Sequence, residues 1–538
     1  MPPDAALSAY MSMAVVRHLA PEVILIAVAT LIYVAGAFVR AREVWSYLAF
    51  TGILGAAYAL WTSPIGDGAL GPVLADDLAG YVRWLTLVVG GLMVLMLSRF
   101  SNQAAASEIV GTLLMITAGL MLVASSGELV LMFLGLELVT FPTYLLLYLG
   151  RVDARGQESA AKYFYLSILA AALMLYGFSF LYGAAGSTQL ADLGRVLGSQ
   201  REVVADGAVT RTTTQQIAGL GLVFLFAGLG FKLTAVPFHF YAPDVYQGTT
   251  NPNAGLLSVA PKIAGVVALL RIVAAAMPEM EPIAWRVVLI MSVLTMTVGN
   301  VIALWQDNIR RMLAYSSIAH AGYLMVGLAA GFAAQGVGGE AAADGLNGFG
   351  ATLLYLAVYA LATLGTFAAL TYLGGASADD PDGTIDHVEQ LAGLARRRPL
   401  TASAIAVFMF SLAGIPPLAG FWGKFALFTS ALSIDGGEAY PGLGNWFIAL
   451  AVIGVLNAAV AAAYYLRIIA VMYFKPLEKE PSAEGGPGAS LAMTLCAMAV
   501  LVIGIMPGQL ITRSRAASAS LESESPSPVA AAAMDMAR

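Results

Sequence analysis

The chain alternates long apolar segments with short polar connections. A helix that crosses the hydrocarbon core of a bilayer needs about 20 mostly apolar residues. By this criterion the sequence predicts about 14 transmembrane helices, near 20–39, 44–62, 79–98, 108–125, 128–149, 159–183, 216–232, 253–276, 284–304, 309–331, 348–373, 400–414, 445–474 and 490–511. The predicted fold class is an all-α polytopic membrane protein.

Two of the predicted spans are interrupted. The seventh continues past Pro237 and Pro243, and the twelfth passes Gly414 and two prolines before a second half near 418–433. Proline inside a spanning helix frees backbone groups that protein or water must satisfy. Paired interruptions in the two halves of a chain point to a transport site.

A short repeated motif suggests how the halves are related. Leu270-Arg271-Ile272 ends the eighth span, and Leu466-Arg467-Ile468 stands at the same place in the thirteenth. We therefore predict that spans 4–8 and 9–13 are two five-helix repeats, inverted because five is odd. The predicted organisation is N-terminal spans 1–3, a first repeat, a second repeat, span 14 and a disordered tail, at 1–106, 107–276, 277–475, 476–512 and 513–538.

Composition agrees with a membrane protein and excludes several other classes. Hydrophobic residues make up 59% of the chain and charged residues 11%, whereas soluble domains contain about 25% charged residues. The net charge of −6 includes no basic block for nucleic acid. The lone Cys496 excludes an internal disulfide and a cysteine-ligated iron–sulfur cluster. The N-terminus shows no pattern of a cleaved signal peptide.

The distribution of basic residues predicts the orientation, because short cytoplasmic loops are enriched in lysine and arginine. The loops that follow odd-numbered spans hold Arg40, Arg42, Arg99, Arg151, Arg155, Arg310, Arg311, Arg396, Arg397, Arg398, Lys475 and Lys479. We expect these loops to be cytoplasmic and both termini to lie outside the cytoplasm. The long loop 184–215 is an exception, with three arginines.

Lysine is rare in this chain, yet it occurs inside apolar spans. Of six lysines, Lys232, Lys262 and Lys424 lie within spans and Lys162 lies near the start of another. A lysine at the bilayer centre costs roughly 2.5–3.5 kcal/mol on insertion scales. Unlike arginine, lysine can release its proton when it is buried. A row of buried lysines therefore indicates a proton relay.

One carboxylate, Glu137, lies in the middle of the fifth span. Its expected partner is Lys232, beside the break in the seventh span, and we predict the two within ion-pair reach, because an unpaired buried charge is heavily penalised. The alternative is a static ion pair that locks two helices.

The remaining candidates are Lys262, Lys424 and two histidines. We expect Lys262 to be buried among hydroxyl groups or waters, without a carboxylate in contact; its alternative is a snorkelling cation. Lys424 follows the break in the twelfth span and could instead lie at an interface. His239 and His320 could pass protons near neutral pH, or could be ordinary interior histidines. Asp244 is interpreted as a turn cap, and Arg271 and Arg467 as structural.

Four long motifs carry a resemblance to a known family. Residues 231–248 read FKLTAVPFHFYAPDVYQG, 256–262 read LLSVAPK, 308–323 read NIRRMLAYSSIAHAGY and 413–421 read AGIPPLAGF. These closely resemble subunit N of respiratory complex I, the proton-translocating NADH:quinone oxidoreductase, within the family of antiporter-like subunits. The resemblance runs over roughly 80–510. One departure is Tyr241, where the family often has tryptophan.

The resemblance implies a row of protonatable groups along the membrane midplane. By position, Glu137 and Lys232 match the family's input pair, Lys262 its central lysine, Lys424 its span 12 lysine and Lys162 a further lysine in span 6. The lysine in span 12 fits subunit N better than the related subunit M.

The resemblance also implies partners and cofactors. The chain would bind no cofactor or metal itself; NADH, FMN, iron–sulfur clusters and quinone would belong to other subunits. Its partners would be the lipid bilayer, antiporter-like neighbours and small membrane subunits, in a bacterial inner membrane. The rivals are a subunit of a multisubunit sodium/proton antiporter, a non-pumping membrane scaffold, and a photosynthetic complex that accepts electrons from ferredoxin.

Overall fold

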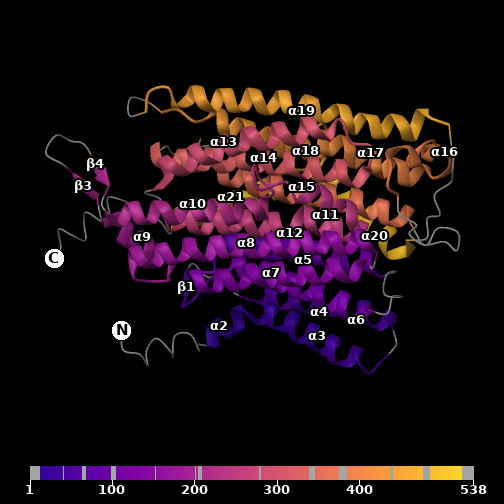
Figure 1. The fold of residues 1–538 in the computed structure, drawn as a ribbon, viewed down its shortest axis with the longest axis horizontal. Coiled ribbons are helices and arrows are strands. Elements are labelled where there is room, and N and C mark those ends of the chain that lie inside the picture. Colours follow the sequence, from indigo (N-terminus) through magenta and orange to yellow (C-terminus); the bar gives the residue numbers. More distant parts are fainter. Residues whose placement is uncertain are drawn as a thin grey trace.

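The computed structural model describes residues 13–39, 42–63, 68–98, 105–151, 153–199, 201–203, 209–211, 213–277, 280–337, 346–374, 385–436, 440–476 and 485–523. In these ranges the chain is a bundle of long helices that run along one common direction (Figure 1). Twelve of the described helices are long and apolar enough to cross a membrane. Two shorter apolar helices, Ala20–Gly36 and Pro399–Ala413, coincide with the first and twelfth predicted spans. The all-α membrane fold is confirmed.

The elements follow the predicted spans closely. The N-terminal half contains α2 (Met13–His18), α3 (Ala20–Gly36), α4 (Arg42–Thr62), β1 (Ala69–Leu70), β2 (Val73–Leu74), α5 (Asp77–Leu97), α6 (Ala106–Ala124), α7 (Leu129–Gly150), α8 (Ala154–Ala185), α9 (Leu190–Ser199), β3 (Arg201–Val203), β4 (Val209–Arg211), α10 (Thr213–Leu233), α11 (Ala242–Gly248), α12 (Asn251–Leu269) and the π-helix η2 (Leu270–Ala275). The C-terminal half contains α13 (Glu281–Ala303), α14 (Ile309–Val337), α15 (Gly348–Leu373), the 3₁₀ helix η4 (Val388–Leu391), α16 (Leu394–Arg397), α17 (Pro399–Ala413), α18 (Ala419–Leu432), α19 (Leu443–Phe474), α20 (Gly486–Ile505) and α21 (Gly508–Ser523). The strands form two small antiparallel hairpins, β1–β2 and β3–β4.

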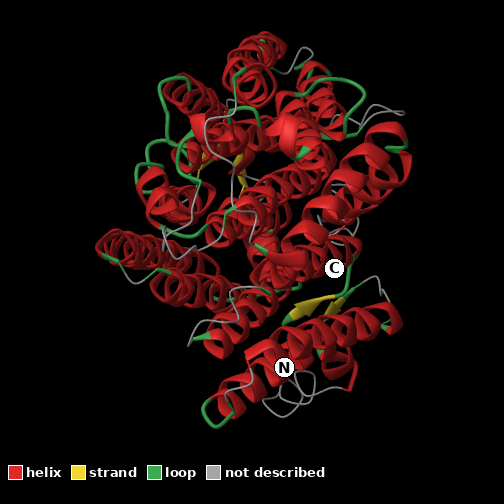
Figure 2. Ribbon diagram, turned by 90° about the vertical axis from the view of Figure 1, so that its right-hand side faces the viewer, coloured by secondary structure: helices red, strands yellow, loops and turns green. Residues whose placement is uncertain are grey.

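The helix α12 is the centre of the bundle. Every residue in the apolar stretch of α12 and η2 is buried, whereas only a third of the apolar stretches of α19 and α20 is buried. Figure 2 views the bundle from one end and shows other helices on all sides of its middle. The middle of the chain is therefore shielded from lipid, and that is where Lys262 lies.

Small residues allow close helix contacts in both halves. Gly119 of α6 and Gly135 of α7 face each other so closely that a Cβ on either would lie about 3 Å from the opposite backbone. In the second half, Gly299 of α13 lies against the backbone of Ala319 in α14, and Gly322 of α14 lies against the backbone of Met296 in α13. Membrane helices gain stability from such van der Waals contact, because lipid provides no hydrophobic drive between them.

The two predicted interruptions are confirmed. The first separates α10 from α11, and the second separates α17 from α18. At the first break, the N–H of Val236 donates to Thr295 Oγ1 of α13 at 2.9 Å. At the second, the N–H of Gly420 donates to Ser411 Oγ at 3.1 Å. Side chains thus satisfy backbone groups that the broken helices leave free.

The first and last described helices meet the same end of α5. His18 Nε2 of α2 accepts from Arg83, which also pairs with Glu22 at 2.7 Å. Ser520 of α21 donates to Asp76, the residue that caps α5. Asp76 also pairs with Arg271 at 2.5 Å, which agrees with a structural role for that arginine.

The prediction for the C-terminal tail was partly wrong. Residues 513–523, expected to be disordered, belong to α21, which packs on α5, α15 and η2. The buried positions Ser514, Ala517, Ser518 and Leu521 recur at helical spacing. Leu521 is the one large apolar residue among them, so a search for apolar runs missed this helix. Residues 524–538 of the predicted tail lie outside the described residues.

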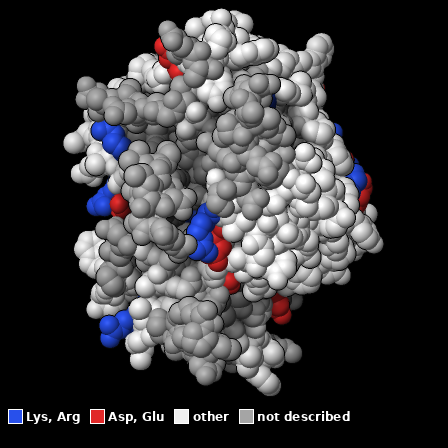
Figure 3. Space-filling model, turned by 90° about the vertical axis from the view of Figure 1, so that its left-hand side faces the viewer, with Lys and Arg blue, Asp and Glu red and all other residues white. Residues whose placement is uncertain are grey.

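The long loop 184–215 also contains structure. Its α9 buries Leu190, Leu193 and Leu197 and exposes Arg195, so it is amphipathic. Charged side chains on the end of the molecule near β3–β4 form small, separate groups (Figure 3). Arg195 pairs with Asp192 of the same helix at 2.6 Å.

Candidate functional site

Lys262 is fully buried in α12 and is surrounded by hydroxyl groups. Its Nζ donates to Ser317 Oγ of α14 at 2.6 Å. Tyr359 of α15 also donates to Ser317, at 2.9 Å, and the Tyr246 hydroxyl lies 3.2 Å from the same oxygen. Among the ion pairs between described residues, none involves Lys262. The prediction of hydroxyl neighbours without a contacting carboxylate is confirmed.

His320 stands one turn further along α14 from Ser317 and binds two tyrosines. Its Nδ1 lies 2.5 Å from the Tyr355 hydroxyl, and its Nε2 lies 2.8 Å from the Tyr465 hydroxyl. Tyr465 in turn bonds Ser316. The ring of Tyr359 lies 4.9 Å from the imidazole. His320 therefore lies next to the Lys262 site and is surrounded by tyrosine side chains.

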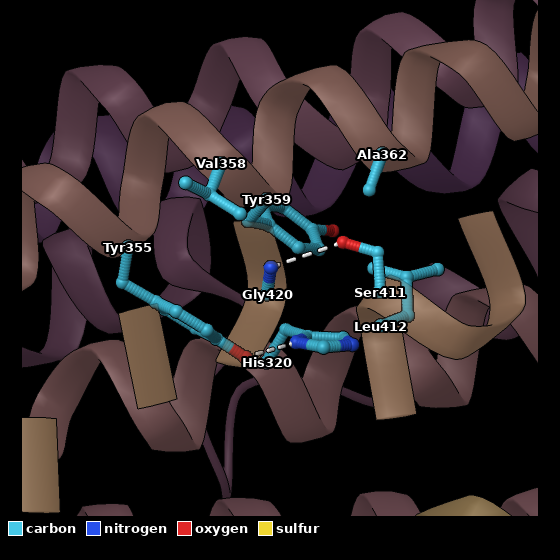
Figure 4. A pocket seen from close by; sticks show the side chains of 8 residues that line it. All are labelled: His320, Tyr355, Val358, Tyr359, Ala362, Ser411, Leu412 and Gly420. Carbon is cyan, nitrogen blue, oxygen red and sulfur yellow. Dashed lines mark hydrogen bonds between the residues drawn. The ribbon is translucent and has the colours of Figure 1, made fainter. Parts of the chain in front are cut away.

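A small cavity adjoins this histidine. It is lined by His320, Tyr355, Val358, Tyr359, Ala362, Ser411, Leu412 and Gly420 (Figure 4). Its volume is about 10 Å³, which is close to the minimum that one water molecule needs. The cavity lies between His320 and the break in the twelfth span, where Ser411 and Gly420 meet.

Lys424 is buried in α18 and binds the end of the other half of its span. Its Nζ donates to the backbone carbonyls of Leu412 and Ala413 at 2.9 and 3.0 Å. These carbonyls belong to the C-terminus of α17, which carries the negative end of a helix dipole. The ring of Tyr323 lies 4.7 Å from the ammonium. Lys424 thus lies inside the protein rather than at an exposed interface.

The predicted direct pair between Glu137 and Lys232 is absent. Lys232 Nζ donates instead to Thr140 Oγ1 of α7 at 2.6 Å, one helical turn from Glu137. The Oε1 atom of Glu137 is buried, with no hydrogen-bond partner in the described part of the chain. The two charges still interact through space. Thr140 was missed because a threonine that bonds the Leu136 carbonyl of its own helix gives no distinct sequence signal.

Lys162 lies at the edge of the bundle, with its side chain 39% exposed. It pairs with Glu158 at 2.7 Å and with Asp244 at 2.8 Å. Asp244 also binds Arg311 at 2.6 Å, so its interpretation as a turn cap was wrong. The place of Lys162 in a relay stays a prediction.

His239 follows the first break and is half-buried. Its Nδ1 is buried without a hydrogen-bond partner among the described residues. Tyr241, the departure from the family pattern, stacks on Phe231 with ring centres 4.2 Å apart and donates to the Phe231 carbonyl. The structure therefore brings Lys262 and His320 together and leaves His239 apart from their hydrogen bonds.

The tyrosines around His320 were missed by the sequence reasoning. Tyr355 and Tyr359 are four residues apart on α15, and so share one helix face. Tyr464 and Tyr465 adjoin on α19, and Tyr464 donates to Asn300 at 3.0 Å. The available signal was a pair of tyrosines in each of two otherwise apolar spans, four residues apart in α15 and adjacent in α19.

Residues 126–440, more than half of the chain, match the family described as NADH:quinone oxidoreductase/Mrp antiporter, TM. The chain belongs to this family. The resemblance carried by the four motifs is therefore confirmed at the level of the family.

Individual relatives agree with the family match. NADH-quinone oxidoreductase subunit N of Trichlorobacter lovleyi is 36% identical over 91% of this chain and 94% of its own length. Subunit N 2 of Roseiflexus castenholzii is 37% identical over 89% and 91%. A chain of respiratory complex I from Thermus thermophilus with bound aureothin shares the fold, with a TM-score of 0.72, 31% identity and coverage of 92% and 99%. A chain of the Mrp complex from Dietzia has a TM-score of 0.73 at 20% identity over 95% and 98%, which shows the shared fold alone.

Proposed function

We propose that this chain is the subunit N of a bacterial proton-translocating NADH:quinone oxidoreductase and moves protons through buried lysines. The observation that carries the proposal is the arrangement around α14. Ser317 accepts from Lys262, and His320, one turn away, bonds two tyrosine hydroxyls. The ring of His320 also contacts Tyr323, whose ring faces Lys424. A hydroxyl can donate and accept, and imidazole can exchange a proton near neutral pH, so these groups suit proton transfer.

The polarity of α12 supports loading of Lys262 from the predicted cytoplasmic side. Between its start and Lys262 lie Asn251, Asn253 and Ser258, all buried, and beyond Lys262 residues 263–270 are all apolar. Buried polar groups attract water, whereas an apolar wall stays dry. A proton on Lys262 would then leave sideways, toward His320 and Lys424.

In this function Glu137 and Lys232 respond to changes in neighbouring subunits. Their charges are coupled but not bonded in this structure. A conformational change that brings them together or separates them further alters the electrostatic potential at Lys262, and in a region of low dielectric such changes are large. Lys162 and His239 would pass protons nearer the predicted cytoplasmic side, where protons enter. NADH, FMN, iron–sulfur clusters and quinone would be held by other subunits.

The main rival is a subunit of a multisubunit sodium/proton antiporter, because the Mrp fold is shared. The motifs in spans 7 and 10, together with relatives at 36–37% identity, favour subunit N. The remaining rivals are a non-pumping scaffold and a ferredoxin-dependent complex. We infer a bacterial inner-membrane location, with both termini outside the cytoplasm.

Purification of the native complex from the host membrane tests this proposal. Subunit N predicts co-purification with a peripheral arm that contains flavin and iron–sulfur clusters, and NADH-driven proton uptake by inverted vesicles with added quinone. An antiporter predicts a complex without those cofactors and sodium-dependent proton exchange. Co-purification with a peripheral arm that oxidises ferredoxin but not NADH would support the photosynthetic type.

A further inference from the structure

Asp244 lies between two cations that come from different helices. One carboxylate oxygen accepts from Lys162 of α8 at 2.8 Å, and the other from Arg311 of α14 at 2.6 Å. Arg311 also donates to Gln247 of α11 at 3.1 Å. Asp244 therefore joins α11 to both of its neighbours at the edge of the bundle.

The same short helix reaches the central lysine. Two residues after Asp244, the Tyr246 hydroxyl lies 3.2 Å from Ser317 Oγ, which accepts from Lys262. Arg311 and Ser317 both belong to α14. The helices α11 and α14 are thus joined at two places, at the edge by Arg311, which binds Asp244 and Gln247, and at the Lys262 site by Tyr246.

The position of α11 depends on contacts of this kind. It has only seven residues and is separated from α10 by the break, so no continuous helix fixes its orientation. On its other side it packs tightly on α8, where Ser159 donates to the Asp244 carbonyl at 3.3 Å. Loss of the Asp244–Arg311 pair removes the ionic contact between α11 and α14 and leaves the hydrogen bonds of Gln247 and Tyr246 to α14.

We propose that Asp244 is a positioning residue for proton transfer at Lys262. Its ion pair with Arg311 holds α11 against α14 and so keeps the Tyr246 hydroxyl on Ser317. Tyr246 and Tyr359 then fix which way the Ser317 hydroxyl points, and with it the acceptor that Lys262 meets. This inference rests on the proposed proton transport.

The test compares Asp244→Asn with Asp244→Glu and Glu158→Gln in the assembled complex. Asp244→Asn keeps the shape of the side chain but removes the ion pair. We expect the proton-to-electron ratio to fall about tenfold, the lower end of the range for loss of one hydrogen bond to a charged group. Asp244→Glu should restore most of the ratio. Glu158→Gln is the matched control, because it neutralises the other carboxylate bound to Lys162 and should leave the ratio unchanged.

Two further variants test the role of the Asp244–Arg311 pair independently of Asp244→Asn. Arg311→Gln removes the same ion pair and leaves Asp244 bound to Lys162, so it decides the question if Asp244→Asn fails to assemble. The double variant Asp244→Asn/Arg311→Gln should be no worse than either single one, because residues that act as one pair are not additive.

A native proton-to-electron ratio in Asp244→Asn or Arg311→Gln overturns the inference. Less complex in the membrane with a native ratio per complex also overturns it, because that result indicates structural support alone. The Lys262→Ala variant distinguishes an error in the inference about Asp244 from an error in the proposed function. If Lys262→Ala pumps like the native complex, the proton-transport proposal itself is wrong.

Discussion

The surroundings of Lys262 and Lys424 differ in the kind of acceptor that each ammonium meets. Lys262 donates to a serine hydroxyl that also accepts from Tyr359. Lys424 donates to two backbone carbonyls at the end of α17. Both lysines are buried and neither pairs with a carboxylate among the described residues. Their charges are therefore balanced by different means.

This difference changes how each site can respond when its lysine gains or loses a proton. A hydroxyl donates or accepts, so Ser317 can serve a charged or a neutral lysine by rotation. Carbonyls only accept, and the helix dipole adds a negative potential, so the α17 terminus favours the charged form of Lys424. Loss of the proton from Lys424 would therefore leave two carbonyls without a donor, whereas rotation of the Ser317 hydroxyl can accommodate a neutral Lys262.

Replacement of Lys262 should have the largest effect. Lys262→Ala should leave the complex assembled, because an apolar methyl is tolerated in the bundle, and Lys262→Arg should hold the charge fixed. Both should lower coupled quinone reduction about a hundredfold, since a positioned acid–base group contributes at least that much. Proton uptake and quinone reduction in inverted vesicles are the measurements. Native rates in both variants would make Lys262 a bystander.

Lys424→Arg should have the next largest effect and should act on pumping rather than on folding. Arginine keeps the charge that the α17 carbonyls hold, but it releases no proton at any relevant pH. The expected result is a normal amount of complex with a proton-to-electron ratio well below native. Lys475→Arg, at an exposed ion pair, is the control. A native ratio in Lys424→Arg would show that Lys424 does not titrate.

Ser317→Ala should have a moderate effect, because it removes the acceptor of Lys262 and leaves the lysine in place. A fall in coupled turnover of about fivefold is expected for one lost hydrogen bond. Ser292→Ala is a suitable control, since Ser292 is a buried serine that bonds a backbone carbonyl outside this site. Equal turnover of the two variants would argue against the hydroxyl as a proton carrier.

Tyr323→Phe should have the smallest effect. It keeps the ring that faces Lys424 and removes only the hydroxyl that accepts from Asn300 at 3.2 Å. We expect a change in turnover of about twofold, whereas Tyr323→Leu, which removes the ring, should lose about fivefold through the cation–π contact. A larger loss in Tyr323→Phe than in Tyr323→Leu would assign the role to the hydroxyl.

Much of the fold could be predicted because hydrophobic length is a local property. The predicted spans, the breaks at Pro237 and Pro417 and the burial of Lys262 and Lys424 follow from composition, proline chemistry and the bilayer. The helix α21 could not be found in this way, because its buried face contains two serines and an alanine and only one large apolar residue, Leu521.

The order of residues along the chain sets which charges lie in the membrane, whereas packing between distant segments sets what each charge meets. Glu137 and Lys232 were expected to bond directly, yet packing gave Lys232 the Thr140 hydroxyl. Ser317 reaches Lys262 across 55 residues of sequence. The carbonyls of Leu412 and Ala413 are free to accept from Lys424 because α17 ends there and α18 packs beside that end. Such partners depend on how side chains from distant segments pack, and local periodicity carries no information about that packing.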